Sequence, residues 1–113
     1  MKTIIAGSRT IGDYSLVEDA VKACGWDVTT VICGGATGVD TLGAEWAIKN
    51  RVTIKSYPAK WNVHGKKAGY IRNVEMAEVG DALILIWDGT SRGSKMMKDI
   101  ATKKGLRIYE KVV

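Results

Sequence analysis

Three short turns carry the residues of this sequence that are best suited to binding chemistry. They are Gly7-Ser8-Arg9, Gly34–Asp40 and Asp88–Ser94, and each directly follows an apolar run. Glycines let a turn bend tightly and present its backbone N–H groups without a Cβ in the way. A helix that begins behind such a turn adds unpaired N–H groups and a partial positive charge. These turns therefore suit a phosphate or a carboxylate.

The middle turn also has a purely structural interpretation. Glycines can serve a strand-to-helix connection by geometry alone, and Thr37 followed by Asp40 resembles a capping box with Asp in place of Glu or Gln. The turn is not a Walker A loop, because no Gly-Lys-Ser/Thr follows, and it is not the G-x-G-x-x-G fingerprint. The repetition of such turns after three apolar runs favours the binding interpretation.

Charged and polar side chains in and near the turns extend the candidate site. Arg9 could form a forked contact with a phosphate. Arg72 either binds the ligand together with Asn73 or forms a salt bridge to Asp40, Glu45 or Asp88. Asp40 itself either binds a ribose hydroxyl or caps a helix. The candidate ligand-binding residues are Gly7, Ser8, Arg9, Gly34, Gly35, Ala36, Thr37, Gly38, Asp40, Arg72, Asn73, Asp88, Gly89, Thr90, Ser91, Arg92, Gly93 and Ser94.

Aromatic residues and the only histidine complete the inventory. Trp61 and Tyr70 could stack on a base, although core or interface packing is the commoner role of Trp. Neither a metal-ligand set nor a Ser-His-Asp set can be assembled around His64. We therefore expect no metal, no resident cofactor and no recognisable catalytic residue.

The elements that position these residues alternate between strand and helix. Asp13 is a predicted N-cap, residues 58–65 are a predicted loop, and Met96, Met97, Ile100 and Ala101 are predicted to be the buried face of the last helix. Strands are expected at residues 2–6, 29–32, 52–57, 81–87 and 106–109. Helices are expected at residues 14–24, after Asp40 as far as Asn50-Arg51, at residues 66–78, and after Ser94 as far as Gly105.

This alternation predicts an α/β fold, a Rossmann-like three-layer sandwich with a five-stranded parallel sheet. The third and fifth strands alternate between apolar and polar residues, which is typical of edge strands, so the predicted order is 3-2-1-4-5. Ligands of such sheets bind at the carboxyl ends of the strands, where the strand order reverses. The three glycine turns are therefore expected to meet there.

Composition bounds the class of protein. The sequence has 113 residues, 46% of them hydrophobic, which predicts a single domain over residues 1–113. It has no apolar stretch of membrane-spanning length and its first residues do not resemble a signal peptide, so we expect a cytoplasmic protein without membrane contact. Cys24 and Cys33 lie in apolar contexts and are expected to be buried thiols.

The net charge of +5 is unevenly distributed. Residues 1–50 contain four Lys or Arg and six Asp or Glu, a net −2, whereas residues 51–113 contain thirteen and six, a net +7. A basic second half indicates either an anionic partner, such as a nucleotide or a nucleic acid, or a solvated basic surface.

Five segments of the sequence, taken in order, carry a family resemblance. They are Gly7–Arg9, Gly34–Asp40, Pro58–Trp61, Gly65–Ala77 and Asp88–Ser94. Together they resemble YspA-like proteins of the SLOG superfamily, named for the SMF/DprA and LOG proteins. The resemblance implies a Rossmann-like domain that binds a nucleotide or a nucleotide-derived molecule, of a kind found in bacteria and phages.

The LOG branch of the superfamily cleaves the N-glycosidic bond of nucleoside monophosphates with an Arg and a Glu. Arg72 occupies a place similar to that Arg, but the position of the Glu falls on Met97. This departure from the LOG pattern removes the carboxylate, so we predict binding without efficient hydrolysis. Two alternatives remain: a LOG-like N-glycosidase that uses Asp40, Glu45, Glu75 or Asp88 as its acid, and DprA-like nucleic-acid binding through the basic second half.

LOG and DprA relatives tend to form pairs. Trp46, Trp61 and Tyr70 would supply the aromatic surface that interfaces use. We therefore expect a homo-oligomer, a dimer or larger.

Overall fold

The structure is a computed structural model that describes all residues, 1–113. Five strands form one sheet in which every neighbouring pair is parallel, in the order β3-β2-β1-β4-β5, as predicted. The elements are β1 (Lys2–Gly7), α1 (Tyr14–Ala23), β2 (Thr30–Cys33), α2 (Val39–Lys49), β3 (Thr53–Ser56), α3 (Trp61–His64), the 3₁₀ helix η1 (Gly65–Lys67), α4 (Ala68–Val79), β4 (Ala82–Trp87), α5 (Arg92–Lys103) and β5 (Arg107–Val112).

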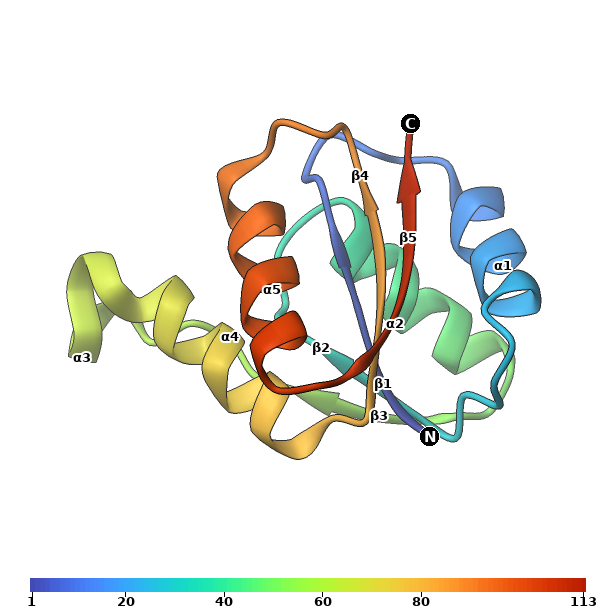
Figure 1. The fold of residues 1–113 in the computed structure, drawn as a ribbon, viewed down its shortest axis with the longest axis horizontal. Coiled ribbons are helices and arrows are strands. Elements are labelled where there is room, and N and C mark those ends of the chain that lie inside the picture. Colours follow the sequence, from blue (N-terminus) through green and yellow to red (C-terminus); the bar gives the residue numbers. More distant parts are fainter.

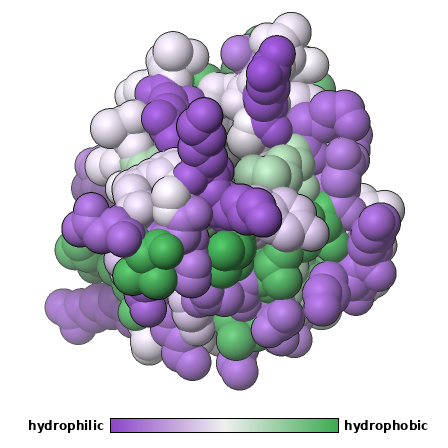
Figure 2. Space-filling view, turned by 90° about the vertical axis from the view of Figure 1, so that its left-hand side faces the viewer, coloured by the Kyte–Doolittle hydropathy of each residue, from purple (hydrophilic) through white to green (hydrophobic).

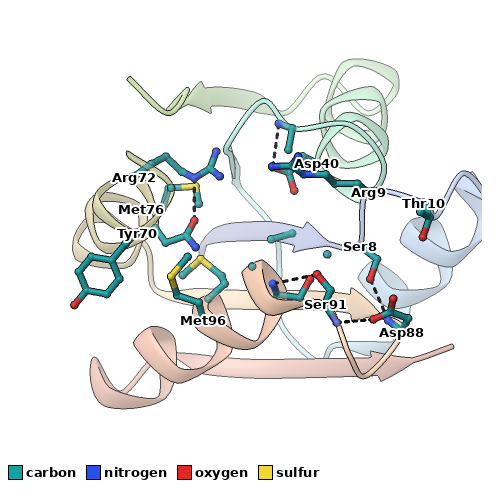
Figure 3. A pocket seen from close by; sticks show the side chains of 18 of the residues that line it. Ser8, Arg9, Thr10, Asp40, Tyr70, Arg72, Met76, Asp88, Ser91 and Met96 are labelled. Atoms are coloured by element: carbon teal, nitrogen blue, oxygen red, sulfur yellow. Dashed lines mark hydrogen bonds between the residues drawn. The ribbon is translucent and has the colours of Figure 1, made fainter. Parts of the chain in front are cut away.

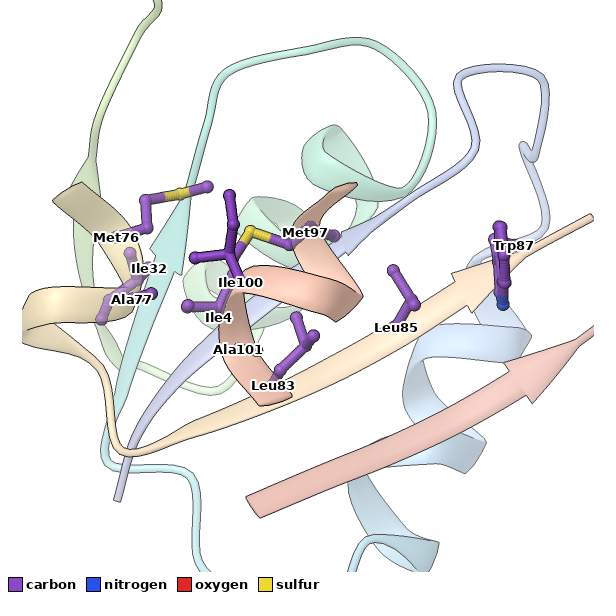
Figure 4. Close-up of a cluster of buried hydrophobic side chains, with 11 residues drawn as sticks. Ile4, Ile32, Met76, Ala77, Leu83, Leu85, Trp87, Met97, Ile100 and Ala101 are labelled. Atoms are coloured by element: carbon purple, nitrogen blue, oxygen red, sulfur yellow. The ribbon is translucent and has the colours of Figure 1, made fainter. Parts of the chain in front are cut away.

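Helices cover both faces of the sheet and make the α/β three-layer arrangement (Figure 1). On one face α4 and α5 enclose a cluster that includes Ile4, Leu83 and Met97, shown in Figure 4. On the other face α1 and α2 enclose a cluster that includes Ile5, Val17 and Ile84. Successive residues of β1 and β4 thus point into opposite cores, which explains why both strands are apolar throughout.

The position of each strand follows from its burial. All six residues of β4 are buried, whereas no residue of β3 or β5 is fully buried. Strands with accessible polar side chains are stable only at the edges of a parallel sheet covered on both faces. The order reverses between β1 and β4, and the carboxyl ends of these two strands lie side by side.

The largest differences from the predicted boundaries lie in three places. The expected loop 58–65 contains the one-turn helix α3, which runs into η1 and α4. Helix α5 begins at Arg92 rather than after Ser94, because Ser91 has extended backbone angles and its hydroxyl accepts a hydrogen bond from Ser94 N at 3.5 Å. Strand β5 continues to Val112, three residues beyond Tyr109.

Several local predictions are confirmed. Asp13 caps α1 by accepting a hydrogen bond from Ser15 N at 3.0 Å. Cys24 and Cys33 are buried free thiols. Trp46, in contrast, is buried in the cluster that α1 and α2 enclose, so its predicted contribution to an exposed aromatic surface is wrong. None of the helices combines the length and the apolar character that crossing a bilayer requires.

Candidate functional site

A cleft of about 480 Å³ opens at the carboxyl ends of β1 and β4, where the strand order reverses. Its walls come from the turns that follow β1, β2 and β4, and from α3, α4 and α5 (Figure 3). Of the candidate residues, those that line it are Gly7, Ser8, Arg9, Ala36, Asp40, Arg72, Asn73, Asp88, Ser91, Gly93 and Ser94. The structure therefore brings all three glycine turns to one cavity.

Seven candidate residues do not line the cleft. A Cβ on Gly34 would overlap the Arg72 guanidinium and one on Gly38 would overlap the Ser8 backbone, so both glycines permit close packing. Arg92 faces a separate groove between α4 and α5. The remaining four are exposed on the outer side of the turns, and they are Gly35, Thr37, Gly89 and Thr90.

The three turns are fastened to one another through Ser8. Its buried hydroxyl accepts a hydrogen bond from Asp88 N at 3.1 Å, and its carbonyl accepts one from Val39 N at 3.4 Å. A Cβ on Gly38 would overlap the Ser8 carbonyl, and a Cβ on Gly7 would overlap that of Ile86. These glycines are therefore needed for close backbone approach.

Asp88 shapes the turn that leads into α5. Its Oδ1 accepts hydrogen bonds from Thr90 N at 2.9 Å and Ser91 N at 2.8 Å, and these N–H groups hold the pKa of the carboxyl below its usual range. The carboxylate thus stabilises the turn, and Ser91 then caps the helix.

The first turn of α5 faces the cleft with unused donors. Ser94 is only 4% exposed, and its Oγ is the one buried side-chain oxygen or nitrogen without a hydrogen-bond partner. A Cβ on the neighbouring Gly93 would meet no atom within 4 Å, so the backbone is open to the cavity there. A buried hydroxyl at a helix N-terminus, beside an open backbone, is the chemistry of an anion site.

Asp40 lies on the opposite wall (Figure 3). It is 6% exposed, and its Oδ2 accepts a hydrogen bond from Ala36 N at 3.3 Å. Burial raises the pKa of this carboxyl above its ordinary value, and the Ala36 N–H and the charges of Arg72 and Arg9 offset part of the rise. The cleft therefore contains a buried carboxylate between two guanidinium groups.

The structural alternative for this turn, a capping box of Thr37 and Asp40, does not form. The N-cap of α2 is Gly38, whose φ of 76° and ψ of −130° start the helix at Val39 and leave Thr37 outside it. No side chain caps this helix, and the Asp40 carboxylate bonds back to Ala36 N instead. Asp40 is thus held in place by the turn and faces the cavity.

Arg72 fastens α4 to the turn after β2. Its Nη1 donates to the Gly34 carbonyl at 2.6 Å and its Nε donates to Asn73 Oδ1 at 2.9 Å. The predicted alternative, a salt bridge to Asp40, Glu45 or Asp88, does not form, because the guanidinium is directed at a carbonyl. Since Oδ1 of the Asn73 amide is engaged, its NH₂ remains the group available to a ligand.

The end of the cleft near α3 presents the aromatic rings of Trp61 and Tyr70, and Lys66 also lines the cleft. Trp61 and Tyr70 are 55% and 54% exposed, which excludes the core role considered for Trp61. The sequence prediction missed Ala6, Thr10, Lys66, Met76, Met96 and Met97 as lining residues. Helical spacing could have found Met96, which lies at the border of the predicted buried stripe and is half-buried here. His64 is half-buried in α3 and does not line the cleft, and no group of three His, Cys, Asp or Glu is placed to hold a metal.

Comparison with known proteins assigns the family. Residues 1–64, more than half of the chain, match the YspA, cpYpsA-related SLOG family. The chain belongs to this family. The match of this SLOG chain includes the turns after β1 and β2 and ends with α3, while the α5 turn lies beyond it.

A phage protein extends the similarity over nearly the whole SLOG chain. The Gene 61 protein of Mycobacterium phage D29 is 34% identical over 119 residues, which cover 95% of this chain and 93% of that protein. No solved structure matches the chain.

Proposed function

We propose that this SLOG protein binds a nucleotide or a nucleotide-derived ligand in the cleft. The observation that carries the proposal is the buried, unpartnered hydroxyl of Ser94 at the N-terminus of α5. A buried polar atom without a partner is costly, and a phosphate oxygen would supply the missing hydrogen bond. Membership of the SLOG family supports the same class of ligand.

The cleft is divided by chemistry in a way that fits the parts of a nucleotide. The phosphate lies on the first turn of α5, at Gly93 and Ser94, with Arg9 as a counter-charge. The base lies at the α3 end of the cleft, against the aromatic rings of Trp61 and Tyr70. The ribose lies between them, where the Asp40 carboxylate accepts a hydroxyl hydrogen bond. Figure 3 shows Tyr70 and Met96 at one end of the cavity and Ser8 and Asp88 at the other.

The test is calorimetric titration with adenosine, guanosine and cytidine 5′-monophosphates. We expect Ser94→Ala to weaken binding roughly 10- to 100-fold, as for one hydrogen bond to a charged group. Thr102→Ala is the matched control, because its hydroxyl bonds the Lys98 carbonyl on the same helix outside the cleft. If the Ser94 variant and the wild type bound the monophosphates with equal affinity, the proposal that the phosphate binds at the N-terminus of α5 would be contradicted.

We propose further that the bound nucleotide is not hydrolysed efficiently. Met97 is 1% exposed at the position where the LOG resemblance implies a carboxylate, and its side chain lines the cleft. Loss of a catalytic acid or base of this type costs about 10²–10⁴-fold in rate. Chromatography of the incubated monophosphates is expected to detect no rapid release of free base.

The second candidate function is cleavage of the N-glycosidic bond with Asp40 as the acid. The observation in its favour is that burial raises the pKa of a carboxyl that lines the cleft. A raised pKa suits a general acid near neutral pH. Rapid release of base that Asp40→Asn abolishes would establish this function in place of simple binding.

Two wider properties accompany the proposal. Because nucleotides are cytoplasmic metabolites, we place the protein in the cytoplasm. We also infer that it forms a homo-oligomer, a dimer or larger, through the side of α3 that Val63 occupies, where this valine is 72% exposed and does not line the cleft.

A further inference from the structure

A second hollow lies beside the cleft, along the groove between α4 and α5. Its volume is about 420 Å³, close to that of the cleft. Tyr70 and Met96 line both cavities, so the two hollows share one wall. The face that α3, α4 and α5 occupy shows separate hydrophobic patches surrounded by hydrophilic side chains (Figure 2). The residues that line this α4–α5 groove are Tyr70, Arg92, Lys95, Met96, Asp99, Ile100 and Lys103.

The groove combines cations with apolar side chains. Arg92, Lys95 and Lys103 provide three positive charges against the single carboxylate of Asp99. Lys95 forms an ion pair with Asp99 at 3.1 Å, and both side chains are more than half exposed. Such an exposed ion pair is weak, so Lys95 can exchange the carboxylate for a phosphate group of a ligand. Tyr70 supplies an exposed aromatic ring.

The cations form a stripe along α5. Arg92 and Lys103 are eleven residues apart, which corresponds to about 16 Å along the helix axis. The stripe starts in the first turn, next to Gly93 and Ser94, and leads away from the cleft. A ligand that leaves the cleft over Tyr70 and Met96 therefore enters a groove with three cations and the single carboxylate of Asp99.

We propose that the natural ligand contains at least two nucleotide units. This inference rests on the proposed function: the first unit occupies the cleft, and the second crosses the Tyr70–Met96 wall into the α4–α5 groove. Each unit of a dinucleotide has a flat apolar base and an anionic phosphate, and each of the two cavities offers apolar side chains beside positive charge. Lys95 and Lys103 attract the second phosphate, and Tyr70 stacks against a base.

The experiment compares adenosine 5′-monophosphate with 5′-phosphorylated diadenylate by calorimetry at low salt. We expect the dinucleotide to bind about tenfold more tightly or better. The double variant Lys95→Ala, Lys103→Ala is expected to lose this gain and to keep the affinity for the mononucleotide, because neither lysine lines the cleft. Lys22→Ala with Lys55→Ala is the matched control, since it removes the same charge from exposed positions on α1 and β3.

The outcomes separate this inference from the function on which it rests. Equal affinities of the wild type for the two ligands would contradict the proposal that a second nucleotide unit binds in the α4–α5 groove. A gain in affinity that survives in the Lys95, Lys103 variant would contradict it as well. Either result would leave the proposed binding of a nucleotide in the cleft unaffected. Absence of binding by both ligands would overturn the proposed function and this inference together.

Discussion

At the residue scale, Asp40 is a carboxyl group that the fold keeps from water. Because its folded pKa lies above the ordinary value of 3.8, the folded state holds a proton that the unfolded state has already lost in the pH range between the two values. Ionisation of Asp40 at higher pH therefore lowers the stability of the folded state. The position of Asp40 in the cleft thus lowers the stability of the folded state, a trade-off that is common at ligand-binding sites.

We expect Asp40→Asn to raise the free energy of unfolding at pH 7. The gain should shrink as pH falls through the folded pKa and vanish below about 3.8, where both states hold the proton. Urea unfolding at a series of pH values measures the difference. Asp88→Asn is the control of opposite sign, because the backbone N–H groups of Thr90 and Ser91 lower that pKa and stabilise the ionised form. A loss of stability in the Asp40 variant at pH 7 would show that attraction to Arg9 and Arg72 outweighs burial.

Residue types could be predicted here more readily than residue contacts. The positions after apolar runs predicted which residues lie near one edge of the sheet, namely Ser8, Arg9, Asp40 and Ser94. The partner of Arg72 did not, because a guanidinium is satisfied by a backbone carbonyl as well as by a carboxylate, and only the folded chain brings the Gly34 carbonyl within 2.6 Å.

At the element scale, α5 is the helix on which the proposed phosphate site depends. Gly93 is its second residue and leaves open space where a Cβ would stand. Gly93→Ala is expected to stabilise the protein by about 0.5–1 kcal/mol, because Ala loses less backbone freedom in a helix. The same methyl group would enter the cleft and weaken binding of adenosine 5′-monophosphate severalfold.

Thermal unfolding and calorimetry on one preparation measure these opposite effects. Gly12→Ala is the matched control, because its Cβ also meets no atom within 4 Å but lies outside the cleft lining. A Gly93→Ala variant that is more stable and binds as tightly as the wild type would exclude close contact between the ligand and this turn.

The order of the elements was predictable, whereas several of their ends were not. Alternation at residues 52–57 and 106–109 correctly placed β3 and β5 at the edges, because side-chain burial and strand position are linked in a covered parallel sheet. The start of α5 depends on Asp88 folding back onto the N–H groups of Thr90 and Ser91, a contact that sequence spacing alone does not specify. Helix α3 has four residues, too few for a periodic pattern.

At the scale of the whole molecule, the end formed by α3 differs from the rest because it both projects and carries exposed, apolar side chains. Helix α3 projects from the body of the protein in Figure 1, and Trp61 and Val63 on it are exposed. We expect a second copy of the chain to pack against Val63 and to leave Trp61 accessible at the cleft. We expect Val63→Asp to convert the oligomer to a monomer because it places a charge in an apolar contact.

Light scattering and sedimentation at high micromolar concentration measure the mass of each form. Val113→Asp is the control, an equally apolar and 51% exposed valine after β5 rather than on α3. A wild-type protein that stays monomeric at these concentrations would contradict the proposed assembly, and an oligomer that persists in the Val63 variant would place its interface elsewhere.

The uneven exposure of the four tryptophans has a practical consequence. Trp46 and Trp87 are buried, and Trp26 lies beneath the Arg107 guanidinium at 5.1 Å, whereas Trp61 stands in water at the mouth of the cleft. The emission of an indole changes when water around the ring is replaced by another group. Occupation of the cleft should therefore quench or shift the fluorescence of Trp61, while the fluorescence of the other three tryptophans should not change. Unknown compounds can thus be screened for binding by intrinsic fluorescence, without any added label.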